Sequence, residues 1–128
     1  MRYTTSGWSH PEDWGTWSDG ADAIILLPLE TKQASTILVE AIPLLSHSHS
    51  KQTVEVKING IHTNSVTLTA NSGGKFEIEI PEKIRQQLRH NKVLKLQLHF
   101  PDAARPVDIG INSDVRTLAI GLIALTAQ

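Results

Sequence analysis

The sequence predicts an all-β fold, an antiparallel β-sandwich of jelly-roll-like form with one short helix. Several short stretches alternate apolar and polar side chains, which is typical of half-buried strands. Glycine, proline and asparagine separate these stretches at regular spacing, and only one segment has helical spacing. The 128 residues fit a single domain, residues 1–128, with one hydrophobic core and neither an internal repeat nor a linker.

The first two strands are predicted from branched apolar residues. Ala23–Leu29 is an apolar run between polar, turn-forming residues, which indicates a buried strand. Because Pro28 cannot donate a ladder hydrogen bond, this strand should lie at a sheet edge or contain a bulge. Ser35–Ile42 predicts a second strand, with apolar residues at alternate positions on the face expected in the core: Ile37, Val39 and Ala41.

The strongest local signal is the Asn59-Gly60 pair, which lies between two alternating stretches, 54–58 and 61–69. Both residues tolerate positive φ, so they predict the tip of a two-residue β-hairpin. The serine- and histidine-rich residues 43–51 precede the hairpin and are expected to form a surface loop. After a turn at 71–74 another strand is predicted, with core-facing residues Phe76, Ile78 and Ile80.

The one helix is predicted over Pro81–Arg89, which begins with proline and an acidic residue and ends with a basic residue. Val93–Phe100 then predicts an amphipathic strand that Pro101 ends. The core face of this strand is made of alternate residues: Leu94, Leu96, Leu98 and Phe100. A loop follows, and an extended piece over 107–111 and a last apolar strand over 118–125 complete the prediction.

Charge and composition exclude several classes of function. The net charge is −1 and the charges are interleaved, so neither a nucleic-acid-binding surface nor a polybasic membrane anchor is indicated. The longest apolar run, Ala23–Leu29, is far shorter than the ~20 residues of a membrane helix. Residues 1–18 lack the apolar stretch of a signal peptide. We therefore expect no nucleic-acid partner and no direct membrane insertion, and the localisation is left open.

No pattern in the sequence indicates a catalytic centre, a metal site or a cofactor. The chain has no cysteine, its serines lie in no nucleophile elbow, and no glycine-rich phosphate loop occurs. His47 and His49 would share one face of a strand, as metal ligands can. No third ligand lies near them in the sequence, so a solvated pair in the surface loop is expected.

The most unusual segment is Gly7–Gly20, which contains all three tryptophans of the protein. An indole face stacks well on the C–H face of a sugar ring, and neighbouring carboxylates accept bonds from sugar hydroxyls. A glycan-binding site is therefore predicted here, with ligand-binding residues Trp8, Glu12, Trp14 and Trp17. The alternative is that the rings close one end of the sandwich as part of its core.

The polar turn before the last strand is a second part of this candidate site. Asp114 and Arg116 are two residues apart and can point the same way, forming a clamp for hydroxyls or for a negatively charged substituent. The alternative is an Asx-type turn in which Arg116 bonds to Glu12 or to loop carbonyls. We expect the two ends of the chain to meet, with Glu12 and Arg116 forming a buried bidentate pair.

Two segments resemble a known family. The run GWSHPEDWGTWSDG resembles the GWS-x-x-E-x-WG-x-WS motif that opens a β-sandwich domain attached to bacterial cell-envelope enzymes. The hosts of that domain are phosphoglycerol transferases acting on periplasmic glucans and glycosyltransferases that build lipopolysaccharide or capsule chains. The tail agrees in order and distance, with FPDAARP, then Ile109-Gly110, then SDVRTLAIGL. The resemblance therefore spans nearly the whole chain.

This resemblance implies an accessory, carbohydrate-associated module with a jelly-roll-like fold and no catalytic centre of its own. Its expected partners are an oligosaccharide or polysaccharide and a glycosyltransferase or phosphoglycerol transferase. The runner-up is a structural or protein-docking domain of such an enzyme, in which the same motif only fixes the fold. The family domain is usually the terminal part of a longer enzyme, so this chain is either an excised domain or a standalone version.

Overall fold

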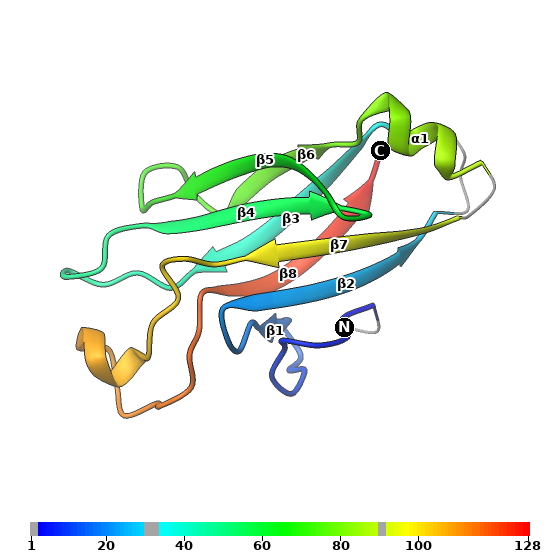
Figure 1. Ribbon diagram of the computed structural model, residues 1–128. Coiled ribbons are helices and arrows are strands. Elements are labelled where there is room, and N and C mark those ends of the chain that lie inside the picture. Colours follow the sequence, from blue (N-terminus) through cyan, green and yellow to red (C-terminus); the bar gives the residue numbers. More distant parts are fainter. Residues whose placement is uncertain (1–2, 30–33, 90–91) are drawn as a thin grey trace.

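The computed structural model describes residues 3–29, 34–89 and 92–128 and consists of two packed β-sheets (Figure 1). Each sheet has four strands, in the orders β1-β8-β3-β6 and β2-β7-β4-β5. The elements in chain order are β1 (Thr16–Trp17), β2 (Asp22–Pro28), β3 (Thr36–Pro43), β4 (Gln52–Ile58), β5 (Ile61–Leu68), β6 (Lys75–Glu79), α1 (Glu82–Gln87), β7 (Val93–His99), the 3₁₀ helix η1 (Pro106–Ile109) and β8 (Ile120–Ala127). The predicted all-β sandwich is confirmed.

The strand pairs are nested in a way that defines a jelly roll. β4 pairs with β5, β3 with β6, β2 with β7 and β1 with β8, and every pair is antiparallel. The chain therefore behaves as one long hairpin that is rolled up, so that its strands are shared between two sheets. No helix in the described ranges is long and apolar enough to cross a membrane.

The core lies between the sheets and is filled by alternate residues of the strands. The residues predicted for the core face are all buried: Ile37, Val39, Ala41, Phe76, Ile78, Ile80, Leu94, Leu96, Leu98 and Phe100. Since side chains alternate along a strand, the residues between them point away from the core. The outer faces therefore carry the polar residues of strands such as β6 and β7, together with exposed apolar residues of β2 and β3 such as Leu26 and Ile42.

Two turn predictions are also confirmed. Asn59 has a φ of 49° and Gly60 a φ of 84°, and they form the tip between β4 and β5. Asn59 Oδ1 also accepts a hydrogen bond of 2.8 Å from the backbone N–H of Lys95, which ties the tip to β7. Pro28 ends β2, which is an edge strand of its sheet, so the missing donor breaks no internal ladder.

Three segments differ from the prediction. The expected extended piece over 107–111 is instead η1, because Pro106 fixes φ at the first helical position and Gly110, at φ 77°, ends the turn. The last strand begins and ends two residues later than predicted, at Ile120–Ala127. The two-residue strand β1 was not predicted, since a strand this short has no readable periodicity.

Candidate functional site

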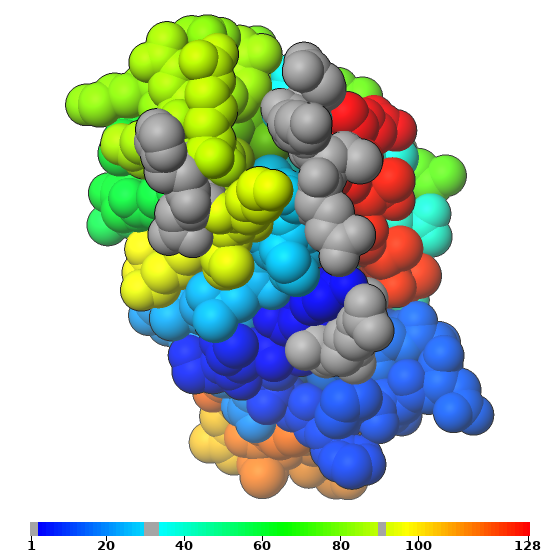
Figure 2. Space-filling model, turned by 90° about the vertical axis from the view of Figure 1, so that its right-hand side faces the viewer, coloured from blue at the N-terminus to red at the C-terminus, as the bar shows by residue number. Residues whose placement is uncertain are grey.

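The tryptophan-rich segment, residues 7–20, folds as a lobe that closes one edge of the sandwich; we call it the N-terminal lobe. Figure 2 shows it in blue, between β2 and the orange segment that precedes β8. The backbone N–H of Ser9 donates to Trp17 O over 2.8 Å, and Thr16 Oγ1 donates to Ser9 O over 2.9 Å. The buried Ser18 Oγ accepts bonds of 3.1 Å from two amides of the opposite end of the chain, Ala119 N and Ile120 N. Thr16 therefore closes the lobe on itself, and Ser18 holds the lobe to the start of β8.

Trp8 joins this lobe to the core. Its ring is half-buried against the core cluster, and its indole N–H donates to Ile24 O over 3.0 Å. A buried indole needs such a partner for its single donor. This ring therefore has a structural role, as the alternative interpretation of the tryptophans expected.

Trp14 and Trp17 lie on the outer face of the β1-β8-β3-β6 sheet. Both rings pack over Gly121, where a Cβ atom would come within 2.7 Å of Trp14 Cη2 and 3.4 Å of Trp17 Cε2. The two rings make an edge-to-face contact, with centroids 5.7 Å apart and planes at 72°. Trp14 is 37% exposed and is the one indole of the three that presents much of its surface to solvent.

The two ends of the chain do meet, but Arg116 does not pair with Glu12. Gly20 N donates to Thr117 O over 2.8 Å, which places the lobe beside the polar turn. Among the described residues the guanidinium of Arg116 pairs with Asp114, with Nη2 2.6 Å from Oδ2 and Nε 3.1 Å from Oδ1. Glu12 is exposed and forms no ion pair within 4.0 Å in this part of the chain. The expected Glu12–Arg116 pair is wrong because a tight Asx-type turn gives Arg116 a nearer carboxylate.

This turn shifts the pKa values of both partners. The side-chain hydrogen bond from Arg116, followed by the Arg116 backbone N–H, lowers the pKa of Asp114 below 3.8. The hydrogen bond to Asp114 raises the pKa of Arg116, and the charges of Asp19 and Glu12 add smaller contributions in the same direction. Glu12 and Asp19 thus act on Arg116 electrostatically.

Because the pKa of Asp114 is lowered in the folded protein, its pairing contributes stability above the unfolded value of 3.8, and that stability is lost as pH falls through the folded value. We therefore expect Asp114→Asn to lower Tm at pH 7 and to lower it by less at pH 2. Thermal unfolding at the two pH values measures this difference. An equal loss at both would mean that the carboxylate charge is not what stabilises the turn.

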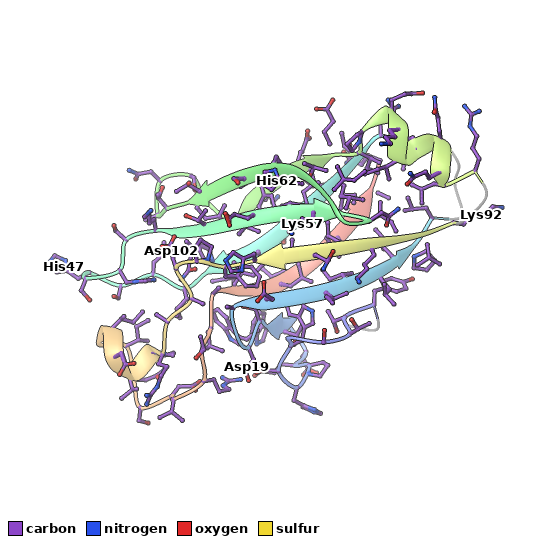
Figure 3. All side chains as sticks on the ribbon, viewed as in Figure 1. Asp19, His47, Lys57, His62, Lys92 and Asp102 are labelled. Atoms are coloured by element: carbon purple, nitrogen blue, oxygen red, sulfur yellow. The ribbon has the colours of Figure 1, made fainter. Side chains whose placement is uncertain are left out.

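The histidine-rich loop is more ordered than predicted. His47 is exposed at the tip of the loop (Figure 3), as expected. His49 is half-buried, and its Nε2 lies 2.7 Å from Asp102 O, so the prediction of a solvated pair is wrong for this residue. Beside it the buried Gln52 donates to Leu44 O and Asp102 O over 3.0 and 3.2 Å. In the described ranges no group of three histidine or acidic residues is arranged to hold a metal.

A groove of about 470 Å³ lies on the outer face of the β2-β7-β4-β5 sheet; we call it the sheet groove. All four strands of the sheet contribute to it, and one residue comes from the segment that precedes the N-terminal lobe. The lining residues are Ser6, Asp22, Ala23, Ile24, Glu55, Lys57, His62, Gln97, Leu98 and His99.

The register of the strands aligns the outward side chains of the groove in two rows across the sheet. The first row contains Asp22, His99 and Glu55, and Ser65 on β5 continues this row beyond the groove lining. The second row contains Ile24, Gln97, Lys57 and His62. Directly opposed side chains in antiparallel strands have Cβ atoms about 4.5–5.5 Å apart. The first row is therefore a continuous line of polar groups, and the second row is a line of polar groups with the apolar Ile24 at one end.

The first row is held by a histidine between two carboxylates. His99 Nδ1 lies 2.8 Å from Asp22 Oδ1, and His99 Nε2 lies 4.0 Å from Glu55 Oε2. A carboxylate only accepts hydrogen bonds, so Nδ1 carries a hydrogen in this contact. The row therefore offers acceptors to a ligand, while Gln97 and Lys57 in the second row add donors.

None of the predicted ligand-binding residues lies in the sheet groove. Trp8, Glu12, Trp14, Trp17, Asp114 and Arg116 belong to the N-terminal lobe and the turn beside it. The groove residues are the polar halves of strands whose alternation was recognised in the sequence. That pattern indicates only a solvent-facing side, and which polar residues meet across strands depends on the pairing register.

Comparison of the chain with protein-family models and with curated proteins found no match.

Proposed function

We propose that this protein is a non-catalytic glycan-binding module and that the sheet groove is its binding surface. The observation that carries the proposal is the groove itself, an open hollow across four strands in which two aligned rows supply hydrogen-bond donors and acceptors. A sugar presents hydroxyls in every direction and C–H patches on its ring faces. The groove offers polar partners for the hydroxyls and Ile24 for apolar contact.

The composition of the groove disfavours other ligand classes. Seven of the ten lining residues are polar or charged, whereas cofactor sites are lined mostly by hydrophobic and aromatic side chains. Its charges are mixed, with Asp22 and Glu55 beside Lys57, which is unlike the single-sign surface that a nucleic-acid backbone requires. A groove of mixed charge that crosses four strands suits an oligosaccharide chain lying across them.

The geometry of the sheet groove supports glycan binding without catalysis. Ser6 is the only hydroxyl among the groove-lining residues, and in the described structure no hydrogen bond joins it to His99. A serine nucleophile needs a base within hydrogen-bond reach. The His99–Asp22 pair thus supplies hydrogen-bonding groups to the groove without activating a nucleophile.

The proposed partners follow from the resemblance of the two chain ends to the envelope-enzyme accessory domain. The ligand would be a cell-envelope oligosaccharide or polysaccharide, and the host a glycosyltransferase or phosphoglycerol transferase. In such an arrangement the module holds a glycan chain near the catalytic domain, which raises the local concentration of substrate.

The test is a calorimetric titration of the wild-type chain with a panel of cell-envelope oligosaccharides. Replacing Gln97 with alanine should weaken binding by about tenfold, because an amide that bonds the ligand through donor and acceptor is lost. Glu77→Ala, on the outer face of the other sheet, is the matched control and should bind as the wild type does. Failure of every glycan to give saturable binding would overturn the proposal.

Trp14→Ala separates the sheet groove from the site predicted in the sequence. If the groove binds the glycan, this variant should keep the wild-type affinity, because Trp14 lies over Gly121 on the other sheet. Loss of binding in Trp14→Ala with retention in Gln97→Ala would move the site to the N-terminal lobe, with Glu12, Trp17, Asp114 and Arg116 as the next positions to change.

A docking domain is the second candidate function, and a different surface favours it. Val107, Ile111 and Val115 in the segment around η1 are 40%, 41% and 63% exposed. Three exposed apolar residues in one loop are more than folding alone requires, and such patches mark protein contacts. A module that binds no glycan but co-purifies with its host enzyme through this loop would fit that function.

A further inference from the structure

The two ends of the second row in the sheet groove differ in chemistry. Ile24 on β2 is its apolar end, and Lys57 and His62, on the neighbouring strands β4 and β5, form its basic end. Figure 3 labels both residues of the basic end, which lie side by side on these strands. The groove therefore carries the ammonium of Lys57 and the imidazole of His62 on its β4–β5 side, with Glu55 in the neighbouring row of β4, and the carboxylate of Asp22 at its β2 side.

A β-bulge sets this basic end. The register of β4 with β5 shifts between Val56 and Lys57, so that Val56 faces Asn64 while Lys57 faces His62. Thr63 is the extra residue, and its Oγ1 donates to Asn64 Oδ1 over 3.0 Å. A bulge redirects a side chain relative to the regular ladder, and here it brings His62 opposite Lys57.

Lys57 has no carboxylate partner within 4.0 Å among the described residues. Several other cations of the protein do, including Lys75 with Glu40, Arg85 with Glu82 and Arg116 with Asp114. The nearest carboxylate along its own strand, Glu55, lies in the first row and is 4.0 Å from His99 Nε2. The ammonium of Lys57 is thus available to a ligand that lies in the groove.

We infer that the sheet groove takes an acidic glycan, whose negatively charged substituent is held by Lys57 and His62. This inference rests on the proposed function. The hydroxyls of the same saccharide bond to Asp22, Glu55 and Gln97, and the apolar ring face lies toward Ile24. The carboxylate of Asp22 at the far side repels the anionic group and the ammonium of Lys57 attracts it, so charge sets the direction in which the chain lies across the strands.

The expected size of the preference for an acidic glycan follows from the solvent exposure of Lys57. Lys57 is exposed, and an ion pair in such a place changes affinity by up to about fivefold at low salt. The preference should shrink as ionic strength rises, because salt screens exposed charges. A neutral oligosaccharide of the same backbone should show little salt dependence.

Matched ligand pairs test the inference. Cellohexaose and the β-1,4-linked hexamer of glucuronic acid differ only in a hydroxymethyl and a carboxylate group, and maltohexaose with its 6-phosphorylated form tests phosphate. The acidic member of a pair should bind about fivefold more tightly than the neutral member in low-salt buffer. Which pair shows the difference tells whether the substituent is a carboxylate or a phosphate.

Lys57→Gln should abolish the preference for the acidic member, because glutamine keeps hydrogen-bonding groups at this position but carries no charge. Lys83→Gln, on the outer side of α1, removes the same charge elsewhere and should keep the preference. Equal affinity for both members, or a preference that survives in Lys57→Gln, would overturn the inference while glycan binding stands. No saturable binding of any ligand would overturn the proposed function and this inference with it.

Discussion

Replacing Leu96 with alanine should lower the free energy of unfolding by about 2–5 kcal/mol. Leu96 lies at the centre of β7, fully buried, with Ile25 and Ile58 directly opposite it on the two neighbouring strands. Truncation removes buried methyl groups and leaves a cavity between two sheets that cannot collapse freely. Urea unfolding followed by tryptophan fluorescence measures the change.

Gln97→Ala is the matched control because it changes the next residue of the same strand. Gln97 points into the sheet groove, away from the core, so its loss should cost less than about 0.5 kcal/mol of stability. The two neighbouring variants should therefore have opposite effects, with Leu96→Ala unstable and Gln97→Ala stable but weak in glycan binding. Similar stability losses in both would contradict the assignment of the two faces of β7.

The fold was predictable because its signals are local. Alternation at 76–80 and 93–100 gives the core face of two strands directly, and Asn59-Gly60 specifies its own turn geometry. The segment 107–111 was mispredicted because its apolar residues suggested a strand, whereas Pro106 and Gly110 bound a 3₁₀ turn. Backbone constraints from proline and glycine outweigh a weak apolar pattern in so short a piece.

The candidate site was harder to predict because it depends on pairing. Asp22, Glu55 and His99 are 33 or more residues apart in the sequence, and only the register of three strands puts them in one row. A glycan-binding site was predicted in the N-terminal lobe because this segment contains all three tryptophans. In the structure these residues have packing roles. Trp8 packs on the core and bonds to Ile24 O, and Ser18 accepts hydrogen bonds from two buried backbone amides.

The second large loss of stability is expected on substitution of Gly15, in the tryptophan-rich segment 7–20. Gly15 is buried where β1 meets β8, and a Cβ atom added there would overlap the carbonyl oxygen of Leu122. The next atoms it meets, at 3.0 and 3.3 Å, are Leu122 C and Ile123 Cα. All three are backbone atoms and no side chain can turn away, so Gly15→Ala must separate β1 from β8. We expect a loss of about 3 kcal/mol in the free energy of unfolding, typical of overpacking at a rigid site.

Gly20→Ala provides the control within the same lobe. Gly20 has a φ of 110°, but no atom lies within 4 Å of the added Cβ, so this variant suffers backbone strain alone. That strain amounts to about 1–2 kcal/mol. Chemical denaturation should therefore rank Gly15→Ala clearly below Gly20→Ala, and near-UV circular dichroism should show that the Trp14–Trp17 contact is altered in Gly15→Ala only. If the two variants lose equal stability, close packing of the lobe on β8 is not what the glycine provides. If the ranking holds, the tryptophan-rich motif fixes the fold, which leaves the sheet groove as the place to look for a ligand.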